Sequence, residues 1–152
     1  MGEAYVLDFT HKKKKEYVMI NEVKEWEKDN RTITKVSIVL FNFGWDKNWT
    51  TDYGVESQIY LKNNPGISEG VAEYLAESKV KIVGGDIPTI DSYADPFEKA
   101  HRVLLPSGIY IIENLSNLSA LPPTGSFVVA TPLKIKGGTG CPVRAFAFVP
   151  CE

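Results

Sequence analysis

The sequence predicts an α/β fold, with helices flanking a largely parallel sheet and a hairpin of two strands near the end of the chain. Apolar runs typical of strands alternate with segments of helical periodicity as far as Ile112, which favours a parallel sheet with helices packed on it. The last two apolar runs, 126–135 and 143–149, are separated only by a glycine-rich turn. That pair predicts an antiparallel hairpin and makes the sheet a mixed one.

The composition is that of an ordinary globular protein, and we expect residues 1–152 to form one domain. The chain has 43% apolar and 24% charged residues, enough to build one sizeable core. A formal net charge of -2 gives no basic face for nucleic acid. No stretch has the pattern of a membrane span or a secretory leader, so we expect a cytoplasmic protein with neither membrane nor nucleic acid as partner.

The first elements are predicted from short patterns. Residues 4–9 form an apolar run typical of a buried strand, and the lysine run 12–15 after it reads as a solvated turn. Asn21 is predicted to cap a short helix in which Val23 and Trp26, three residues apart, form the apolar side.

The next strand is followed by a long connection. Residues 36–43 are almost continuously apolar, as in a strand covered on both faces, whereas residues 44–67 are rich in Asn, Asp, Gly and aromatic residues. Connections this long are often functional loops. The aromatic residues there could line a pocket or anchor the loop, and anchoring is favoured because aromatic side chains usually serve packing. They are Trp45, Trp49, Tyr53 and Tyr60.

Two further helix-and-strand units complete the alternation. Ser68 is a plausible N-cap for a helix that leads to the strand 80–83, and a helix over 97–105 leads to the strand 109–112. The glycine-rich turn 136–142 joins two strands rather than a strand and a helix, so we interpret it as a hairpin turn and not as a phosphate-binding loop.

Few residues can carry chemistry. The sequence holds two histidines, His11 and His101, and two cysteines, Cys141 and Cys151, which have no C-x-x-C spacing. It contains no H-E-x-x-H helix, and no catalytic residue is identified. His11 adjoins the lysine turn and is expected to be exposed.

His101 and Glu113 form the more interesting pair. His101 lies on a predicted helix, and Glu113 ends an apolar strand, where a carboxylate is costly unless a cation or hydrogen-bond donors satisfy it. Sites in α/β sheets assemble at the carboxyl ends of strands. Glu113 could cap a turn, pair with Arg102, or bind a metal together with His101. The residues themselves leave these alternatives open, since zinc normally takes at least three protein ligands.

Several ordered motifs nevertheless resemble the cyclase family, which includes kynurenine formamidase and isatin hydrolase. Its C-terminal signature is similar to AHRVLL at 100–105, GIYIIENLSNL at 108–118, LPP at 121–123, PLKIKGG at 132–138 and GCPVRA at 140–145. Segments 43–45, 65–68 and 85–91 also fall in the family's order. The resemblance implies a swivelling β/β/α fold and hydrolysis of amides or lactams with a divalent metal, zinc or manganese.

The same resemblance implies roles for four residues. His101 and Glu113 match the family's two C-terminal metal ligands, whereas Asp86 and Asp91 match polar positions that shape the site. The family's upstream His-Gly-Thr-His-x-Asp-x-Pro-x-His segment, which carries the other ligands and an acid/base histidine, is matched by no residue here. We therefore expect the C-terminal portion of a cyclase-like domain, truncated at the N-terminus and a poor catalyst by itself.

Two hypotheses follow from this interpretation. In the first, the chain belongs to a metal-dependent hydrolase of a small-molecule amide or lactam, and the remaining groups come from elsewhere. In the second, it is a non-catalytic relic of the fold that serves as an oligomeric structural or binding protein. Uncovered strands favour association, so both hypotheses include a homo-oligomer.

Overall fold

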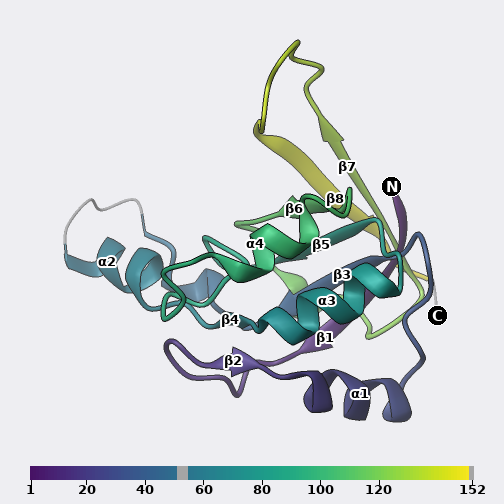
Figure 1. The fold of residues 1–152 in the computed structure, drawn as a ribbon, viewed down its shortest axis with the longest axis horizontal. Helices are drawn as coiled ribbons and strands as arrows, with labels where there is room; N and C mark the ends of the chain where they lie inside the picture. Colours follow the sequence, from purple (N-terminus) through teal and green to yellow (C-terminus); the bar gives the residue numbers. More distant parts are fainter. Residues whose placement is uncertain (51–54, 151–152) are drawn as a thin grey trace.

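A computed structural model describes residues 1–50 and 55–150. It shows a sheet with helices packed against one face and a hairpin that projects away from the body (Figure 1). The strands are β1 Gly2–Asp8, β2 Tyr17–Val18, β3 Ile38–Asn42, β4 Gly66–Ile67, β5 Ile82–Gly85, β6 Tyr110–Ile112, β7 Ser126–Pro132 and β8 Val143–Phe148. The helices are α1 Ile20–Asp29, α2 Val55–Lys62, α3 Glu69–Glu77 and α4 Lys99–Leu104, with 3-10 turns η1 Asp46–Asn48 and η2 Leu118–Ala120.

The main sheet is mixed, as the sequence predicts. Its order is β6-β5-β3-β1-β7-β8; the first four strands are parallel, whereas β7 runs antiparallel to β1 and β8 antiparallel to β7. The expected C-terminal hairpin is confirmed by the pairing of Ala130 with Ala145. A separate two-stranded sheet joins β2 and β4 in parallel.

The helices cover one face of this sheet. Successive side chains of a strand point to opposite faces, so Tyr5 and Leu7 of β1 pack into a large core against the helices. Val23 of α1, Leu75 of α3 and Leu104 of α4 meet them there, each fully buried. Burial of apolar surface stabilises a fold by roughly 25 cal/mol per Å², so this large layer of buried side chains is a main source of stability.

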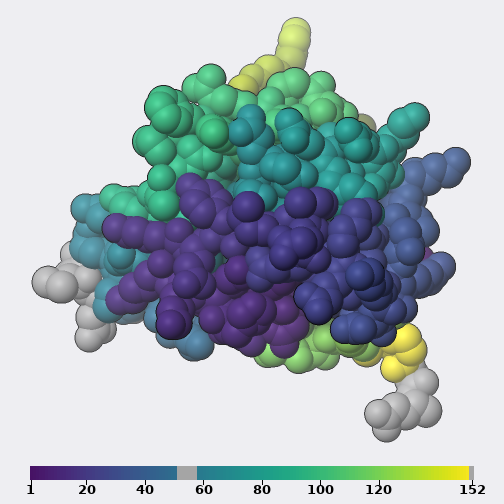
Figure 2. Space-filling view, turned by 60° about the horizontal axis from the view of Figure 1, so that its bottom comes forward, coloured from purple at the N-terminus to yellow at the C-terminus, as the bar shows by residue number. Residues whose placement is uncertain are grey.

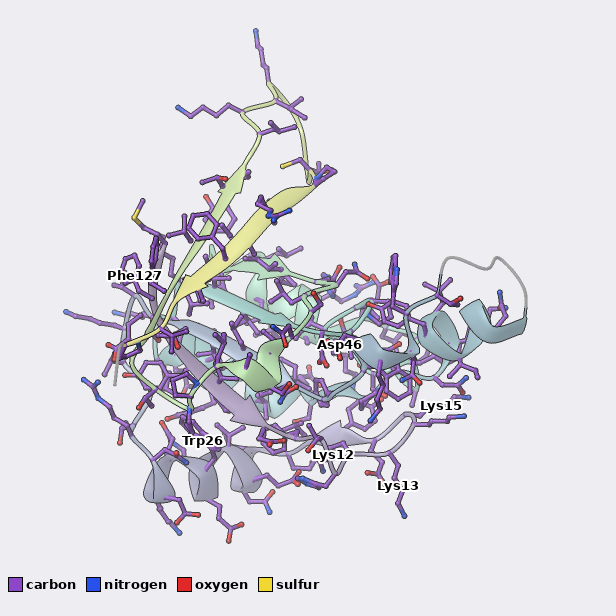
Figure 3. All side chains as sticks on the ribbon, turned by 180° about the vertical axis from the view of Figure 1, so that it is seen from behind. Lys12, Lys13, Lys15, Trp26, Asp46 and Phe127 are labelled. Carbon is purple, nitrogen blue, oxygen red and sulfur yellow. The ribbon has the colours of Figure 1, made fainter. Side chains whose placement is uncertain are left out.

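The opposite face has a smaller core. Ala4 and Val6 of β1, together with Ile38 and Leu40 of β3, pack there against Leu118 of η2. Beyond them the hairpin stands away from the body (Figures 1 and 3), and several of its large apolar side chains are exposed. This end of the molecule is therefore much less covered than the helical side.

One predicted helix cap is confirmed and one is wrong. The Ser68 hydroxyl accepts a hydrogen bond from the Val71 backbone N–H at the start of α3. Asn21 is not a cap, because α1 begins at Ile20 with Met19 in the N-cap position. The Glu22 carboxylate accepts a hydrogen bond from the Met19 N–H at 2.9 Å and satisfies the helix start without Asn21.

The connection 44–67 is more structured than predicted, since it contains η1, α2 and β4. Anchoring by aromatic residues is confirmed for two of them, because Trp45 and Tyr60 are buried. The Trp45 indole Nε1–H donates to the Tyr60 carbonyl at 3.1 Å. Trp49 is exposed and its ring meets the edge of Tyr60, while Tyr53 lies outside the described residues.

The lysine run is a surface turn, as predicted. Figure 3 shows Lys13 and Lys15 on the outside of the molecule, and Figure 2 shows the N-terminal residues as a broad, closely packed surface. Lys12 pairs with Glu22 at 2.8 Å, so this turn carries an ion pair on its inner side. None of the described helices has the length and apolarity needed to cross a membrane.

Candidate metal centre

The pair singled out in the sequence comes together in space. His101 lies on α4, and Glu113 follows β6 directly at the carboxyl end of the parallel strands. The His101 Nε2 atom is 3.3 Å from Glu113 Oε1. Both side chains are about three-quarters buried, with 25% and 28% of their surfaces exposed, so they face each other at the border of the core.

Asp91 holds the other side of the imidazole. Its Oδ2 atom lies 2.5 Å from His101 Nδ1, and its side chain is only 2% exposed. The Oδ1 atom accepts a hydrogen bond from the Ala100 backbone N–H at 2.6 Å. Glu98, in the N-cap position of α4, makes no side-chain cap, so Asp91 satisfies the start of the helix from the preceding loop.

Glu113 is held by the backbone of that same loop. Its Oε1 atom accepts a hydrogen bond from the Ile90 N–H at 3.0 Å, so a backbone donor satisfies part of this carboxylate. The Arg102 Nε–H donates instead to the Phe97 carbonyl. Thus the carboxylate of Glu113 is directed toward His101 and the loop 90–91.

The strand end that carries Glu113 is fixed by its neighbour. Asn114 has a left-handed backbone with φ of 57°, and its Oδ1 atom accepts a hydrogen bond from the Tyr60 hydroxyl at 2.9 Å. Burial, followed by the nearby charges of Asp86 and Asp46, raises the pKa of the Tyr60 phenol. The hydroxyl therefore stays protonated and keeps donating. Sequence patterns offered no signal for this contact, which joins residues 54 positions apart.

The two carboxylates make His101 strongly basic. Hydrogen bonds to Asp91 and then to Glu113 raise the pKa of the His101 imidazolium to about 10 against the cost of burial. Without a metal the ring therefore carries two protons at neutral pH. A metal that binds Nε2 must displace the proton on that nitrogen.

Asp86 has a structural task. Its Oδ1 atom accepts from the Phe43 N–H at 2.9 Å and its Oδ2 atom from the Trp45 N–H at 2.6 Å, so it fixes the turn after β3. Burial raises the pKa of this carboxyl, and the backbone donors oppose that rise. Asp86 is fully buried and bonded through both oxygens, so it acts as a structural carboxylate of this turn.

The donor set fits part of a metal centre. Nitrogen and oxygen ligands about 2.0 to 2.1 Å from a tetrahedral zinc lie about 3.3 Å apart, which matches the separation of His101 Nε2 and Glu113 Oε1. A carboxylate on the far ring nitrogen, as Asp91 provides, is the usual partner of a metal-binding histidine. Within residues 1–50 and 55–150, however, no three His, Cys, Asp or Glu side chains gather into a metal-binding group.

The pair borders a groove in the surface. A groove of about 950 Å³ runs between β6 and the hairpin, with His101, Glu113 and Asn114 among its polar lining residues. Its apolar lining includes Tyr110 and Leu133. A smaller hollow of about 350 Å³ behind η2 is lined by no titratable side chain, so the groove is the better site. His11 lies outside both lining sets and is exposed beside Glu22, as expected.

Comparison with protein families gives a match over residues 1–92 to the family described as "Putative cyclase". Isatin hydrolase from Roseibium aggregatum is 31% identical over 134 residues, which are 84% of this chain and 51% of that protein. Kynurenine formamidase from Salinibacter ruber is 42% identical over 71 residues, 47% of this chain and 33% of that protein. The chain thus spans about half of the first relative's length and a third of the second's.

Solved structures show the same fold. An isatin hydrolase bound to the product analogue thioisatinate superposes with a TM-score of 0.89 at 26% identity, over 99% of this chain and 60% of that one. A protein described as a potential metal-dependent hydrolase with cyclase activity superposes with a TM-score of 0.75 at 25% identity, over 99% of this chain and 66% of that one. The cyclase-like fold predicted from the resemblance is confirmed by these matches.

Proposed function

Because the chain belongs to the cyclase family, we propose that it contributes part of a divalent-metal site that hydrolyses an amide or lactam bond. The observation that carries this proposal is the convergence of His101 Nε2 and Glu113 Oε1 at 3.3 Å. The hydrogen bond from the far ring nitrogen to Asp91 supports it, since that nitrogen is then unavailable and Nε2 is the one directed at a ligand position.

Each residue has a definite task in this proposal. His101 and Glu113 hold zinc or manganese through Nε2 and a carboxylate oxygen, and Asp91 holds a proton at His101 Nδ1. A divalent cation in this place would act as a Lewis acid on a substrate carbonyl. The buried surroundings of the pair strengthen such electrostatic effects by excluding water.

The substrate class follows from the groove and from the relatives. Apolar lining residues such as Leu105, Tyr110 and Ile135 suit an aryl group beside the scissile amide. The matched relatives are named for isatin and for kynurenine formamide hydrolysis, which supports a small aromatic lactam or formamide. Catabolism of tryptophan-derived compounds is the metabolic setting that we propose on the same grounds.

We propose that further ligands come from outside the described residues 1–50 and 55–150. A catalytic zinc normally has three protein ligands and an open position, and this chain brings two candidates together. The groove of about 950 Å³ lies at the upper end of the range for small-molecule sites, about 300 to 1,000 Å³. It therefore has room for a substrate and for a polypeptide segment that carries the remaining donors.

Calorimetry with zinc or manganese tests the ligand assignment. His101→Ala should weaken binding at least tenfold, because it removes the only nitrogen donor of the pair. His11→Ala is the matched control, since His11 is the other histidine of the sequence and lies outside the groove lining. Equal affinity in the unmodified chain and in His101→Ala would refute the proposed site.

Turnover assays test how complete the site is. We expect the chain by itself, with zinc or manganese added, to show negligible hydrolysis of N-formylkynurenine and isatin, because a metal held by two side chains binds weakly. Robust turnover that disappears in His101→Ala would show instead that the chain holds every group needed for catalysis.

The second candidate is an oligomeric, non-catalytic role, favoured by the exposed hairpin. β8 is an edge strand of the sheet, and Phe146 and Phe148 on it are 47% and 62% exposed. Such a patch favours association, so we propose a homo-oligomer that buries at least about 1,000 Å². Sedimentation at micromolar concentration should show it, with Phe148→Ser weakening it, whereas a clean monomer would contradict it.

A further inference from the structure

One dipeptide, Ile90–Asp91, contacts both members of the candidate metal pair. The Ile90 N–H donates to Glu113 Oε1 at 3.0 Å, and Asp91 Oδ2 lies 2.5 Å from His101 Nδ1. We propose that Asp91 is a positioning residue of this site: it selects which ring nitrogen of His101 faces Glu113. The proposal rests on the proposed function for the metal, but its geometry holds without one.

The physical reason lies in the two nitrogens of the ring. A buried carboxylate needs hydrogen-bond donors, and Asp91 receives them from the Ala100 N–H and from His101 Nδ1. A proton on Nδ1 is thereby favoured, so in the neutral ring the lone pair is on Nε2. Since Nε2 is the nitrogen that faces Glu113, Asp91 presents the ligating atom to the other proposed ligand.

The position of Asp91 is set by contacts behind it. Asn64, fully buried, donates through Nδ2 to the carbonyls of Asp91 at 2.8 Å and Thr89 at 3.2 Å. A Cβ built on Gly66 would lie 2.1 Å from the Ser92 backbone nitrogen. Because two backbone segments touch there without any side chain between them, the loop cannot shift toward β4, and Asp91 stays aimed at the ring.

A purely structural role for Asp91 must be distinguished, since the residue also satisfies the start of α4. Asp91→Asn separates the two. The asparagine oxygen can still accept the shorter backbone bond, from the Ala100 N–H, but its amide nitrogen then takes the place of Oδ2 beside Nδ1 and gives up only the 3.4 Å bond from the His101 N–H. A donor at that place moves the ring proton to Nε2, as in a serine-protease triad whose aspartate becomes asparagine. Metal ligation through Nε2 is then blocked.

Nitrogen NMR of the histidine side chains, combined with zinc titration, is the test. The sequence has two histidines, so His11 serves as an internal reference. In the unmodified chain we expect zinc to shift His101 Nε2 while Nδ1 keeps its proton. In Asp91→Asn the zinc affinity should fall by about tenfold to a hundredfold. Urea unfolding of each variant checks that it is folded.

Asp95→Asn is the matched control. Asp95 lies on the same loop and accepts hydrogen bonds from the Phe97 N–H at 2.9 Å and the Lys99 N–H at 3.3 Å. It therefore also supports the start of α4, but no hydrogen bond or ion pair joins it to His101 among the described residues. Its replacement should leave the His101 ring signals and the zinc affinity unchanged.

The outcomes separate this proposal from the proposed function. If zinc shifts neither ring nitrogen in the unmodified chain, the proposed metal site is refuted. The positioning role is then tested in the metal-free chain: loss of the hydrogen-bonded Nδ1 proton in Asp91→Asn supports it, and retention of that proton overturns it. If zinc binds Asp91→Asn as tightly as the unmodified chain, the positioning role is overturned. If Asp91→Asn does not fold, the unmodified chain with zinc bound gives the answer. A proton on His101 Nδ1 supports the positioning role, and zinc bound to Nδ1 overturns it.

Discussion

The centre of the sheet at β3 and its edge at β8 differ in how they are covered. At β3, Phe41 is fully buried beneath the helices, where its ring stacks against both Phe9 and Phe43. At β8, Phe148 is 62% exposed on the hairpin that projects from the body. The same residue type in a strand is thus a core residue in one region and a surface residue in the other. Helix cover, rather than strand formation, determines where apolar side chains stabilise this fold.

The candidate site lies where these regions meet. The covered side supplies the rigid parts, namely Asp91 and the loop that Asn64 and Gly66 hold in place. The open side supplies the groove between β6 and the hairpin. A site at such a boundary has ligands that are held firmly and space that another molecule can enter.

The largest expected effect tests this comparison directly. Phe41→Ala should lower the free energy of unfolding by about 3 to 5 kcal/mol, because it leaves a cavity in a closed core. Phe148→Ala should lower it by less than about 1 kcal/mol, since its ring is mostly in water. Urea unfolding at a concentration where the chain is monomeric measures both. Equal losses would show that the hairpin is packed as tightly as the helical side.

A second test uses two glycines from the two regions. Gly66→Ala should cost about 1 to 3 kcal/mol or more, because overpacking here meets backbone rather than a movable side chain. Gly140→Ala, in the hairpin turn, places its Cβ where no other atom lies within 4 Å and should be nearly neutral. Thermal unfolding of both variants gives the difference. A tolerated Gly66→Ala would mean that the loop carrying Asp91 can move.

The smallest expected effect concerns pH at the boundary. The pKa of His101 is about 10 in the folded metal-free chain against a usual 6.5. A pKa raised by folding stabilises the folded state fully below about 6.5, and that contribution is lost as pH rises through about 10. A charged hydrogen bond contributes about 1.5 to 3 kcal/mol, and partial exposure reduces it here to roughly 1 to 2 kcal/mol.

His101→Gln isolates that contribution, because glutamine keeps polar contacts but does not titrate. Urea unfolding at intervals between pH 6 and 10.5 should show the unmodified chain losing its advantage over His101→Gln as pH rises. A constant difference between the two across this range would contradict the proposed charge on His101.

Local patterns predicted the elements that depend on neighbouring residues. Ser68 was recognisable as a cap because a hydroxyl precedes a helical pattern, and the apolar run at β3 indicated a strand buried on both faces. The prediction of Asn21 as a cap was wrong although asparagine is a good N-cap residue. The helix begins one residue earlier, and the Glu22 carboxylate accepts a hydrogen bond from the Met19 N–H there. The helix α2 was not predicted, because its residues Val55–Lys62 show almost no amphipathic pattern.

The sequence by itself determined the fold class, the hairpin, the family resemblance and the two candidate ligands, since each rests on residue type and spacing along the chain. Only the tertiary structure decided that His101 and Glu113 face each other and that Asp91 stands behind the ring. Those contacts require α4, the loop 90–91 and the end of β6 to pack together, held by Gly66 and Asn64 from another part of the chain. Spacing along a sequence cannot encode such directions, because they depend on how distant segments close around a shared core.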